Sequence, residues 1–395
     1  MNPFLARLLT QQQQLQNAVR GFTPTKFVTP TKAIRGDRTF LSFCSADYLN
    51  LGEHQEIKRA AFQELDSVNL SSHGARLSAG TKELHLLAEK RLAQFLGVED
   101  ALLMPSRTQA CFTLLGLLLT ESDTLFFNDT SESPLSDIVH LIGCKSAVLD
   151  PLAVLNDTTS STRNSVRDER ELNLAILDSS VNFKPTLASD NSAMSIKLRS
   201  NFNFLVFDET YFLASTGIRG AGIHEDLLFV GNDFCLYGDL GASLPCPLAF
   251  IAGPNIILDQ IRSRSRVTSL ESSASSILVK SLVAAIDRVE SLCNERISLT
   301  KKRDQLFDQL PIGSDLVRVS KLGGAGIQFN FKSSLLATKF YEAALSHSAL
   351  LDLVNYSGMS SRVSLVRAFI NTEHTLAELN QLAEILQVFL SRQAV

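Results

Sequence analysis

The sequence predicts an α/β protein built on a doubly wound, mainly parallel sheet. Short apolar runs recur along residues 101–252, and helical segments lie between them. Apolar runs without alternation are typical of strands that helices cover on both faces. The chain of 395 residues, with 45% hydrophobic and 20% charged side chains, is long enough for two or three parts around a shared core. Strands that alternate with helices therefore indicate βαβ units in one sheet.

Seven apolar runs are the expected strands of this sheet. They are Ala101–Met104, Thr124–Phe127, Ser146–Leu149, Leu174–Leu177, Phe204–Phe207, Leu227–Val230 and Ala249–Ala252. Helices are expected between them, for example over Glu83–Phe95 and Gln109–Leu118. The polar stretch Asn156–Asn173 is expected to be a surface loop.

The two ends of the chain differ from this central part. Residues 1–20 carry apolar side chains at helical spacing, which predicts an amphipathic helix before a Pro/Thr-rich connector at Phe22–Thr31. After a Ser/Arg-rich stretch, Arg262–Ser276, a long helix is expected over Ile277–Ile297. The remaining expected elements are strands at Ile327–Phe331 and Val363–Ala368 and helices at Ser334–Ser346 and Thr375–Phe389. We therefore expect a helical arm (1–43), a large α/β domain (44–265) and a smaller α+β domain (266–395).

The composition excludes several classes of function. A net charge of −4 provides no basic field, so neither nucleic acid nor an anionic membrane is an expected partner. No apolar stretch is long enough for a signal peptide or a membrane span, which predicts a cytoplasmic protein. The six cysteines are scattered without metal-ligand or redox spacing, so free thiols and no metal site are expected. Cys235 and Cys246 are expected to be ordinary buried thiols, since no neighbouring base lowers their pKa.

Five motifs follow one another along the chain. Ser71–Met104 contains a glycine/arginine turn, a Ser-x-Gly-Thr step, a histidine and a glutamate helix, at Gly74, Arg76, Ser78, Gly80, Thr81, His85 and Glu89. The other motifs are Ser45–Leu51, Phe207–Tyr211, Thr216–Gly222 and Val366–Phe369, the last with His374-Thr375 after it. Together they resemble the α-oxoamine synthase family of fold type I transferases, which depend on pyridoxal phosphate (PLP). Within that family the chain is most similar to the 8-amino-7-oxononanoate synthases of biotin synthesis.

The resemblance implies a reaction and a set of groups. The family condenses an acyl-CoA thioester with an amino acid, releases carbon dioxide and gives an aminoketone. PLP chemistry there needs a lysine for the internal aldimine, an aspartate at the pyridinium nitrogen, a side chain stacked on the ring and small groups at the phosphate. Asp208 ends an expected strand, where open α/β sheets place their ligands, and is expected to be the inherited aspartate.

The lysine is the main departure from the family pattern. The family places it shortly after a strand, in a Thr-x-x-Lys step. After the strand expected at Leu227–Val230, this position is nearest Phe234, and Gly231 replaces the threonine. No lysine occurs between Lys197 and Lys280. We therefore assign no catalytic residue.

Further pocket positions depart from the family as well. Ser133 stands where the stacking histidine is expected, and Ser106-Arg107-Thr108 replaces the family's Ser-Gly-aromatic phosphate turn. Tyr211 replaces a histidine, and both Tyr211 and Phe234 are expected to fill volume that cofactor takes in relatives. Arg367 lies where the family binds the substrate carboxylate. A carboxylate site and a structural salt bridge both remain open for it.

These departures predict a degenerate homologue without a bound cofactor, and in particular without covalent PLP. The first hypothesis is a non-catalytic partner or regulatory subunit, present as a homodimer or as a heterodimer with a catalytic paralogue. The second is an acyltransferase of the 8-amino-7-oxononanoate synthase type with an altered or shared active site. The third is a protein that binds acyl-CoA or an acyl carrier thioester without turning it over.

Overall fold

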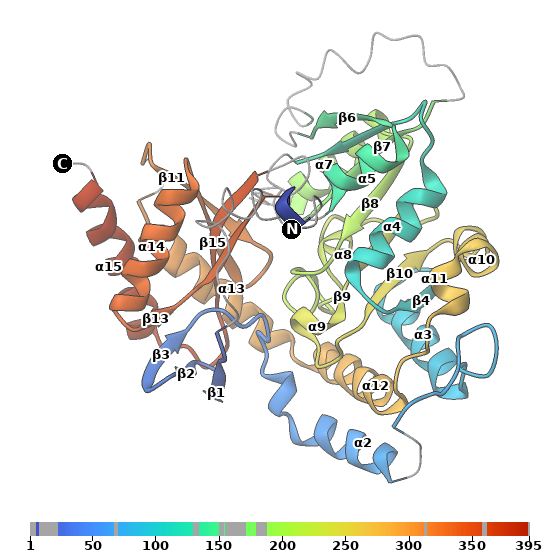
Figure 1. Ribbon diagram of the computed structural model, residues 1–395, viewed down its shortest axis with the longest axis horizontal. Coiled ribbons are helices and arrows are strands. Elements are labelled where there is room, and N and C mark those ends of the chain that lie inside the picture. Colours follow the sequence, from blue (N-terminus) through green and yellow to red (C-terminus); the bar gives the residue numbers. More distant parts are fainter. Residues whose placement is uncertain are drawn as a thin grey trace.

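Three β-sheets and the helices around them form the protein in its computed structural model. The structure describes residues 5–7, 23–66, 70–128, 134–149, 154, 171–178, 188–311, 314–357 and 362–393. Two lobes are evident in Figure 1, one around the largest sheet and one around the two four-stranded sheets. Helix α13 (Cys293–Asp308) passes between them.

The largest sheet has seven strands in the order β4-β10-β9-β8-β7-β5-β6. Their bounds are β4 Asp100–Met104, β5 Thr124–Phe127, β6 Lys145–Val148, β7 Asn173–Leu177, β8 Phe204–Asp208, β9 Phe234–Asp239 and β10 Ala249–Gly253. The strands from β9 to β6 run parallel, and β10 runs antiparallel to both its neighbours. The central strands are buried throughout, because helices cover both faces. The predicted α/β class is confirmed.

Six of the seven expected strands are confirmed, and Leu227–Val230 is wrong. That segment follows α8 (Ile223–Asp226), and Leu228 has a φ of 58°, which no strand tolerates. Its side chains alternate between buried and exposed, as at the end of a short helix that rests on the core. The strand lies later, at β9, where Phe234 to Tyr237 are all fully buried.

The expected long helix over Ile277–Ile297 is two helices. α12 (Ser276–Ser291) and α13 are separated at Leu292, whose φ of −96° and ψ of 39° interrupt the helix. α12 packs against α2 (Gln55–Leu65) and α3 (Glu83–Leu96). In the structure α12 therefore belongs with the large lobe, although the expected boundary at 265/266 assigns it to the smaller domain.

The expected helical arm is only partly described, and its later portion is extended. Strands β1 (Lys26–Thr29), β2 (Lys32–Arg35) and β3 (Arg38–Ser42) form an antiparallel meander. β3 then pairs in parallel with β13 (Ala349–Leu350) of the smaller lobe. The connector expected at Phe22–Thr31 thus contains a strand, because Lys26 to Thr29 find partners in β2 that the local sequence does not reveal. Most of residues 1–20 lies outside the described part.

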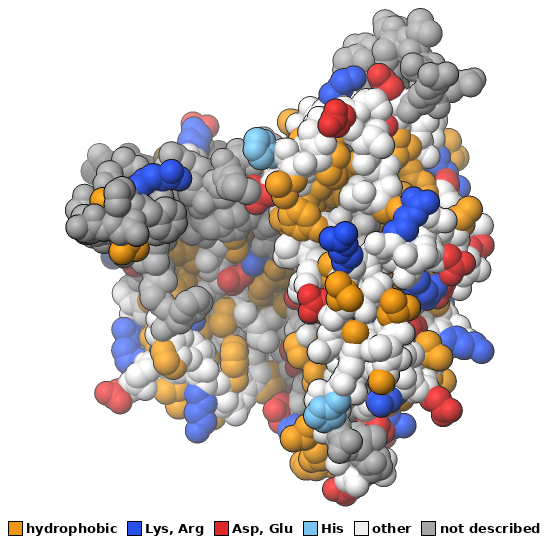
Figure 2. Space-filling view, turned by 45° about the vertical axis from the view of Figure 1, so that its right-hand side comes forward, with side chains coloured by type: hydrophobic (Ala, Val, Ile, Leu, Met, Phe, Trp, Pro, Cys, Tyr) orange, Lys and Arg blue, Asp and Glu red, His pale blue; other side chains and the backbone are white. Residues whose placement is uncertain are grey.

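The smaller lobe is completed by the sheet β11-β12-β15-β14 and the helices α14 (Ser334–Ser346) and α15 (Leu376–Gln393). Its strands are β11 Val317–Leu322, β12 Gly326–Phe331, β14 Asp352–Ser357 and β15 Arg362–Phe369. The space-filling view shows a hollow between the two lobes and charges of both signs interspersed on the face that it presents (Figure 2). Among the described residues, no helix has the length and apolar character that crossing a bilayer demands.

Candidate functional site

Asp208 ends β8 at the carboxyl edge of the large sheet and is 1% exposed. Thr210 donates to its Oδ1 from the backbone nitrogen at 3.2 Å and from Oγ1 at 2.6 Å. Arg107 donates to its Oδ2 from Nε at 3.0 Å and from Nη2 at 2.6 Å. Partners on both oxygens hold this buried carboxylate in one orientation.

Arg107 reaches Asp208 from the first turn of α4 (Arg107–Leu118). Ser106 is the N-cap of this helix, and its Oγ accepts a hydrogen bond from the backbone of Gln109 at 3.3 Å. The Arg107 side chain is 17% exposed, so the ion pair with Asp208 is largely removed from water. The turn Ser106 to Thr108 is the one expected at the phosphate of the cofactor. Through Arg107 it contacts Asp208, the residue expected at the ring of the cofactor.

Tyr211 and Arg367 lie beside this ion pair. The Arg107 guanidinium is 5.9 Å from the centre of the Tyr211 ring, and that of Arg367 is 4.8 Å from it. Nη1 of Arg367 donates to the Tyr211 hydroxyl at 2.8 Å, and its Nε donates to Asp352 at 2.8 Å. The structure thus brings Asp208, Arg107, Tyr211 and Arg367 together. Arg367 can be a carboxylate-binding residue or part of a structural salt bridge. The salt bridge with Asp352 excludes neither role, since the carboxylate of a ligand can replace that of Asp352.

The carboxyl end of β9 lies next to Asp208 in the sheet. Tyr237 of β9 pairs with Asp208, and the Asp239 backbone nitrogen donates to Thr210 Oγ1 at 3.1 Å. Asp239 also caps the short helix α9 (Leu240–Ser243) by accepting from Gly241 at 2.8 Å. Burial raises the pKa of Asp239 above its ordinary value. Two carboxylates and one guanidinium therefore meet at this edge of the sheet.

Two expected site residues lie away from Asp208. Phe234 is the first residue of β9 and pairs with Leu205, so it is roughly 10 Å along the strand from the residue opposite Asp208. Its ring packs between Phe207 and Phe229 with centroids 5.9 Å and 5.8 Å away. Gly231 precedes Phe234 in an exposed turn with a φ of 116°. Ser133 lies outside the described residues.

The thiols and the glycine/arginine motif have structural roles. Burial raises the pKa of Cys235 and raises that of Cys246 to about 12, so neither is a thiolate at neutral pH. Arg76 forms a salt bridge with Glu89 at 2.8 Å, and Glu89 also accepts from the backbone of Leu103 at 3.0 Å. His85 contacts the carbonyl of Ala274 at 2.9 Å. These contacts join α3 to β4 and to the segment before α12.

Sequence reasoning missed the Arg107–Asp208 pair and the place of Asp239. Arg107 and Asp208 are 101 positions apart, which leaves no local signal of their contact. An arginine in an expected phosphate turn is nevertheless an unusual charge. Among the described residues, no group of histidine, cysteine, aspartate and glutamate has the arrangement of a metal site.

Comparisons with known proteins agree with the family resemblance that the sequence motifs indicate. The sequence is 25% identical over 276 residues to 2-amino-3-ketobutyrate coenzyme A ligase from Salmonella typhimurium, covering 68% of each chain. It is 24% identical over 283 residues to 8-amino-7-oxononanoate synthase from Geobacter sulfurreducens, covering 71% of each. The chain is thus similar in sequence to α-oxoamine synthases. No family model matches it.

A solved structure of the same fold corrects the cofactor prediction for this α-oxoamine synthase homologue. It is a lysine-to-alanine variant of serine palmitoyltransferase from S. paucimobilis with a bound PLP–myriocin aldimine. It superimposes with a TM-score of 0.78 at 16% identity, covering 97% of this chain and 96% of that one. The prediction that no cofactor is bound is therefore wrong. It rested on a missing lysine, and that protein holds a PLP adduct with alanine in place of a lysine.

Proposed function

We propose that this α-oxoamine synthase homologue binds PLP, or a PLP adduct, at Asp208 and serves as a partner or regulatory subunit of a lysine-bearing paralogue. The proposal has two parts. The cofactor site is inherited through Asp208, and independent turnover is lost with the lysine. One observation supports the second part: the residue that occupies the family's lysine position when that position is counted from β9.

The family's Thr-x-x-Lys step follows a strand, and the observed strand is β9. Applied there, the step falls on Asp239-Leu240-Gly241-Ala242, with Asp239 in place of the threonine and Ala242 in place of the lysine. An imine with an aldehyde requires an amine, and the chain has no lysine from 198 to 279. The proposal thus replaces Phe234 by Ala242 as the position where the family has its lysine.

The residues around Asp208 fit the ring of PLP. Asp208 is a buried carboxylate at the carboxyl edge of an open sheet, as a pyridinium partner must be. Ser106 and Thr108 lie at the amino end of α4, where backbone N–H groups favour a phosphate. When bound, PLP supplies an electron sink for bonds at the amino-acid α-carbon. Arg107 must leave Oδ2 of Asp208 for the ring nitrogen to donate there.

Reduction with borohydride in the presence of PLP tests this function. We expect saturable PLP binding by equilibrium dialysis that is lost in Asp208→Asn, and no stoichiometric lysine adduct after reduction and peptide mapping. A stoichiometric adduct at one lysine, together with release of coenzyme A from an acyl-CoA by the purified chain alone, would contradict the subunit role. Absence of saturable PLP binding would contradict the cofactor site.

The second candidate is acyl transfer to an amino acid with a lysine supplied by another subunit. The proximity of Arg367 to Asp208 through Tyr211 favours it, because a carboxylate-binding arginine is useful only where an amino acid binds. Mixing the chain with its paralogue and measuring coenzyme A release separates the two. Arg367→Lys in this chain should reduce turnover of the mixture if the acyl transfer uses this site. It should leave turnover unchanged if the chain only regulates.

A further inference from the structure

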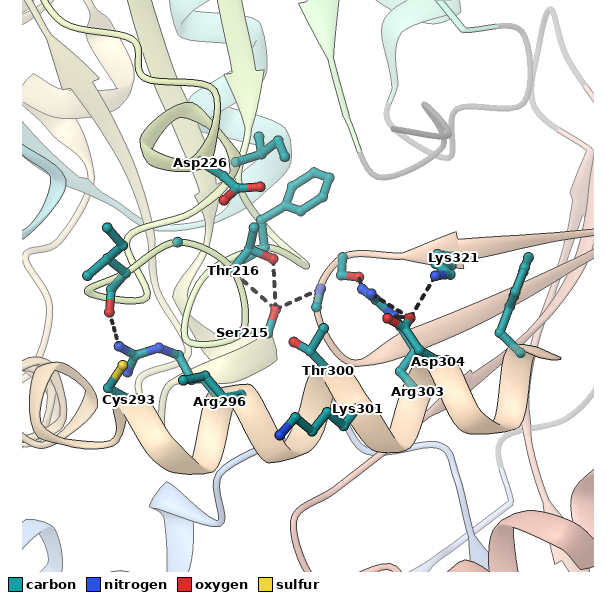
Figure 3. A pocket seen from close by; sticks show the side chains of 18 of the residues that line it. Ser215, Thr216, Asp226, Cys293, Arg296, Thr300, Lys301, Arg303, Asp304 and Lys321 are labelled. Atoms are coloured by element: carbon teal, nitrogen blue, oxygen red, sulfur yellow. Dashed lines mark hydrogen bonds and ion pairs between the residues drawn. The ribbon is translucent and has the colours of Figure 1, made fainter. Parts of the chain in front are cut away.

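A cavity lies against one face of α13. It has a volume of about 720 Å³, within the range of small-molecule sites. One face of α13 forms its floor, the segment from Phe212 to Asp226 forms one wall, and Lys321 to Gly324 close the end (Figure 3). Asp208, Arg107 and Arg367 do not line it. The cavity is therefore distinct from the site of the proposed function.

Arg296 is the unusual residue of this cavity. It is 3% exposed, and its Nη1 and Nη2 donate to the carbonyls of Val289 and Ile218. Its Nε is buried without a hydrogen-bond partner among the described residues, and no described carboxylate forms an ion pair with it. A guanidinium stays charged in a protein, and a buried charge without a counterion is costly. Burial lowers the pKa of Arg296, and the nearby carboxylates of Glu225, Glu295 and Glu290 oppose this without forming an ion pair with it. An anion in the cavity would add a negative charge in contact with the guanidinium.

Neighbours on the same helix face complete a polar subsite. Cys293 precedes Arg296 by one turn and Thr300 follows it by one turn, so all three lie on one face of α13. Figure 3 shows the Cys293 sulfur beside the Arg296 guanidinium, and Thr300 facing Ser215 and Thr216 across the cavity. Lys301 adds a second cation that forms no ion pair with any residue the structure describes.

The rest of the lining is largely apolar and includes the carboxylates of Asp226, Asp304 and Asp308. Phe212, Ile223, Ile297 and Phe307 are apolar side chains of this lining. Asp304 is 2.7 Å from Lys321 Nζ and 2.7 Å from Arg303 Nη2, so this carboxylate is shared between two cations. Burial raises the pKa of Asp226 above its ordinary value. Arg296 and Lys301 thus remain without an ion pair among the described residues, and apolar side chains line the same cavity.

We propose that this cavity binds a small amphipathic anion. Its carboxylate or phosphate group lies beside the Arg296 guanidinium and accepts from the Thr300 hydroxyl, and its apolar part packs against Ile297 and Phe212. Cys293 lies at the mouth of the same subsite and is the one exposed thiol among the six cysteines. The rate at which the Cys293 thiol is alkylated therefore reports whether the cavity is occupied, and no substitution is needed for this measurement.

Protection of Cys293 from alkylation is the test, with octanoate, octyl phosphate and octanol as probes. We expect octanoate or octyl phosphate to slow alkylation of the full chain by iodoacetamide at least fivefold and saturably, and octanol to have less than a twofold effect. The ratio of the two anions tells a carboxylate ligand from a phosphate ester. Equal protection by octanol, or none by either anion, would overturn the proposal.

Two variants make the assignment specific. Ile297→Glu places a carboxylate beside Arg296 on an exposed position, so it should abolish protection while the melting temperature stays unchanged. Ile256→Glu, also exposed, on α10 (Asn255–Arg264) and outside the cavity, is the control and should retain protection. Thr300→Val should weaken octanoate binding about fivefold in calorimetry, as loss of one hydrogen bond predicts. Undiminished protection in Ile297→Glu would show that the anion binds elsewhere.

Discussion

Arg107 donates two hydrogen bonds to Oδ2 of Asp208, at 3.0 Å and 2.6 Å, and thereby takes the acceptor that a pyridinium nitrogen needs. The two residues come from the first turn of α4 and the last residue of β8, on two elements that the sequence separates by 101 positions. In the proposed function, a cofactor at Asp208 would therefore compete with a side chain of the same protein.

Arg107→Ala should strengthen PLP binding. The variant removes the competitor, and charge-assisted hydrogen bonds of this kind contribute about 1.5–3 kcal/mol, so the Kd should fall about tenfold or more. Equilibrium dialysis measures it directly. Arg199→Ala, which removes a surface arginine paired with Asp233, is the control and should leave the Kd unchanged. A weaker Kd in Arg107→Ala would show that Arg107 instead holds the phosphate when PLP is bound.

Ala242→Lys should create a borohydride-trapped PLP adduct at residue 242. The half-buried Ala242 lies in α9, directly after the strand that pairs with β8, so an amine there reaches the Asp208 region. Phe234→Lys should give no such adduct and should destabilise the chain, because it buries an amine among Phe207, Phe229 and His224. Peptide mapping after reduction distinguishes the two. Trapping at residue 234 rather than 242 would restore the position expected from the sequence.

The strands of the large sheet could be predicted from the sequence because each is a short apolar run that must be buried on both faces. The same criterion failed between Leu227 and Tyr237, where two apolar runs follow one another. Burial distinguishes them in the structure, since Leu228 and Val230 are exposed and Phe234 to Tyr237 are not. Choosing the earlier run moved the expected lysine position back along the chain, from Ala242 to Phe234.

The site itself could be predicted only where a residue ends a strand. Asp208 qualifies, because the carboxyl edge of an open sheet is where ligands bind. The reach of Arg107 could not be predicted, since a long side chain has many rotamers and its partner is set by tertiary packing. Neither could the unpaired charge of Arg296, because no local pattern shows whether a carboxylate lies nearby.

Glu89→Ala should destabilise the fold by about 3 kcal/mol. The Arg76–Glu89 pair is largely buried, and removing one partner leaves a desolvated charge without its counterion. Loss of the acceptor for Leu103 adds to the effect. Urea unfolding measures the change. The exposed pair Lys58–Glu53 is the control, and Lys58→Ala should cost under about 1 kcal/mol. Equal effects at the two pairs would contradict a structural role for Arg76.

Stability should fall as pH falls from 6.5 to 4, through His374. Burial lowers its pKa to about 4, its Nε2 donates to the Ser42 carbonyl at 3.0 Å, and its Nδ1 accepts from Asn371. The unfolded chain gains a proton near pH 6.5 that the folded chain does not, so acid favours unfolding by up to about 3 kcal/mol. Nearby Lys302 also disfavours the proton, whereas Glu378 partly opposes this. Urea unfolding of wild type and His374→Gln at pH 7 and 4.5 should show a smaller loss in the variant.

We propose a dimer that forms through the large lobe, and it predicts a specific effect of Leu77 and Leu270. The two leucines are 75% and 72% exposed, on segments that a backbone hydrogen bond from Ser273 to Gly74 joins at 3.0 Å. Large apolar side chains exposed together are typical of surfaces that another protein covers.

The double variant Leu77→Glu/Leu270→Glu should therefore be a monomer in light scattering at micromolar concentration, while the wild-type chain is a dimer. Leu335→Glu, exposed on α14 of the smaller lobe, should remain dimeric because it lies in a different lobe. Two like charges facing their symmetry copies across an interface repel one another, so the double variant should separate even if each single change does not. A double variant that stays dimeric would place the interface elsewhere. A wild-type monomer that recovers no paralogue from its host would remove the basis for a partner subunit.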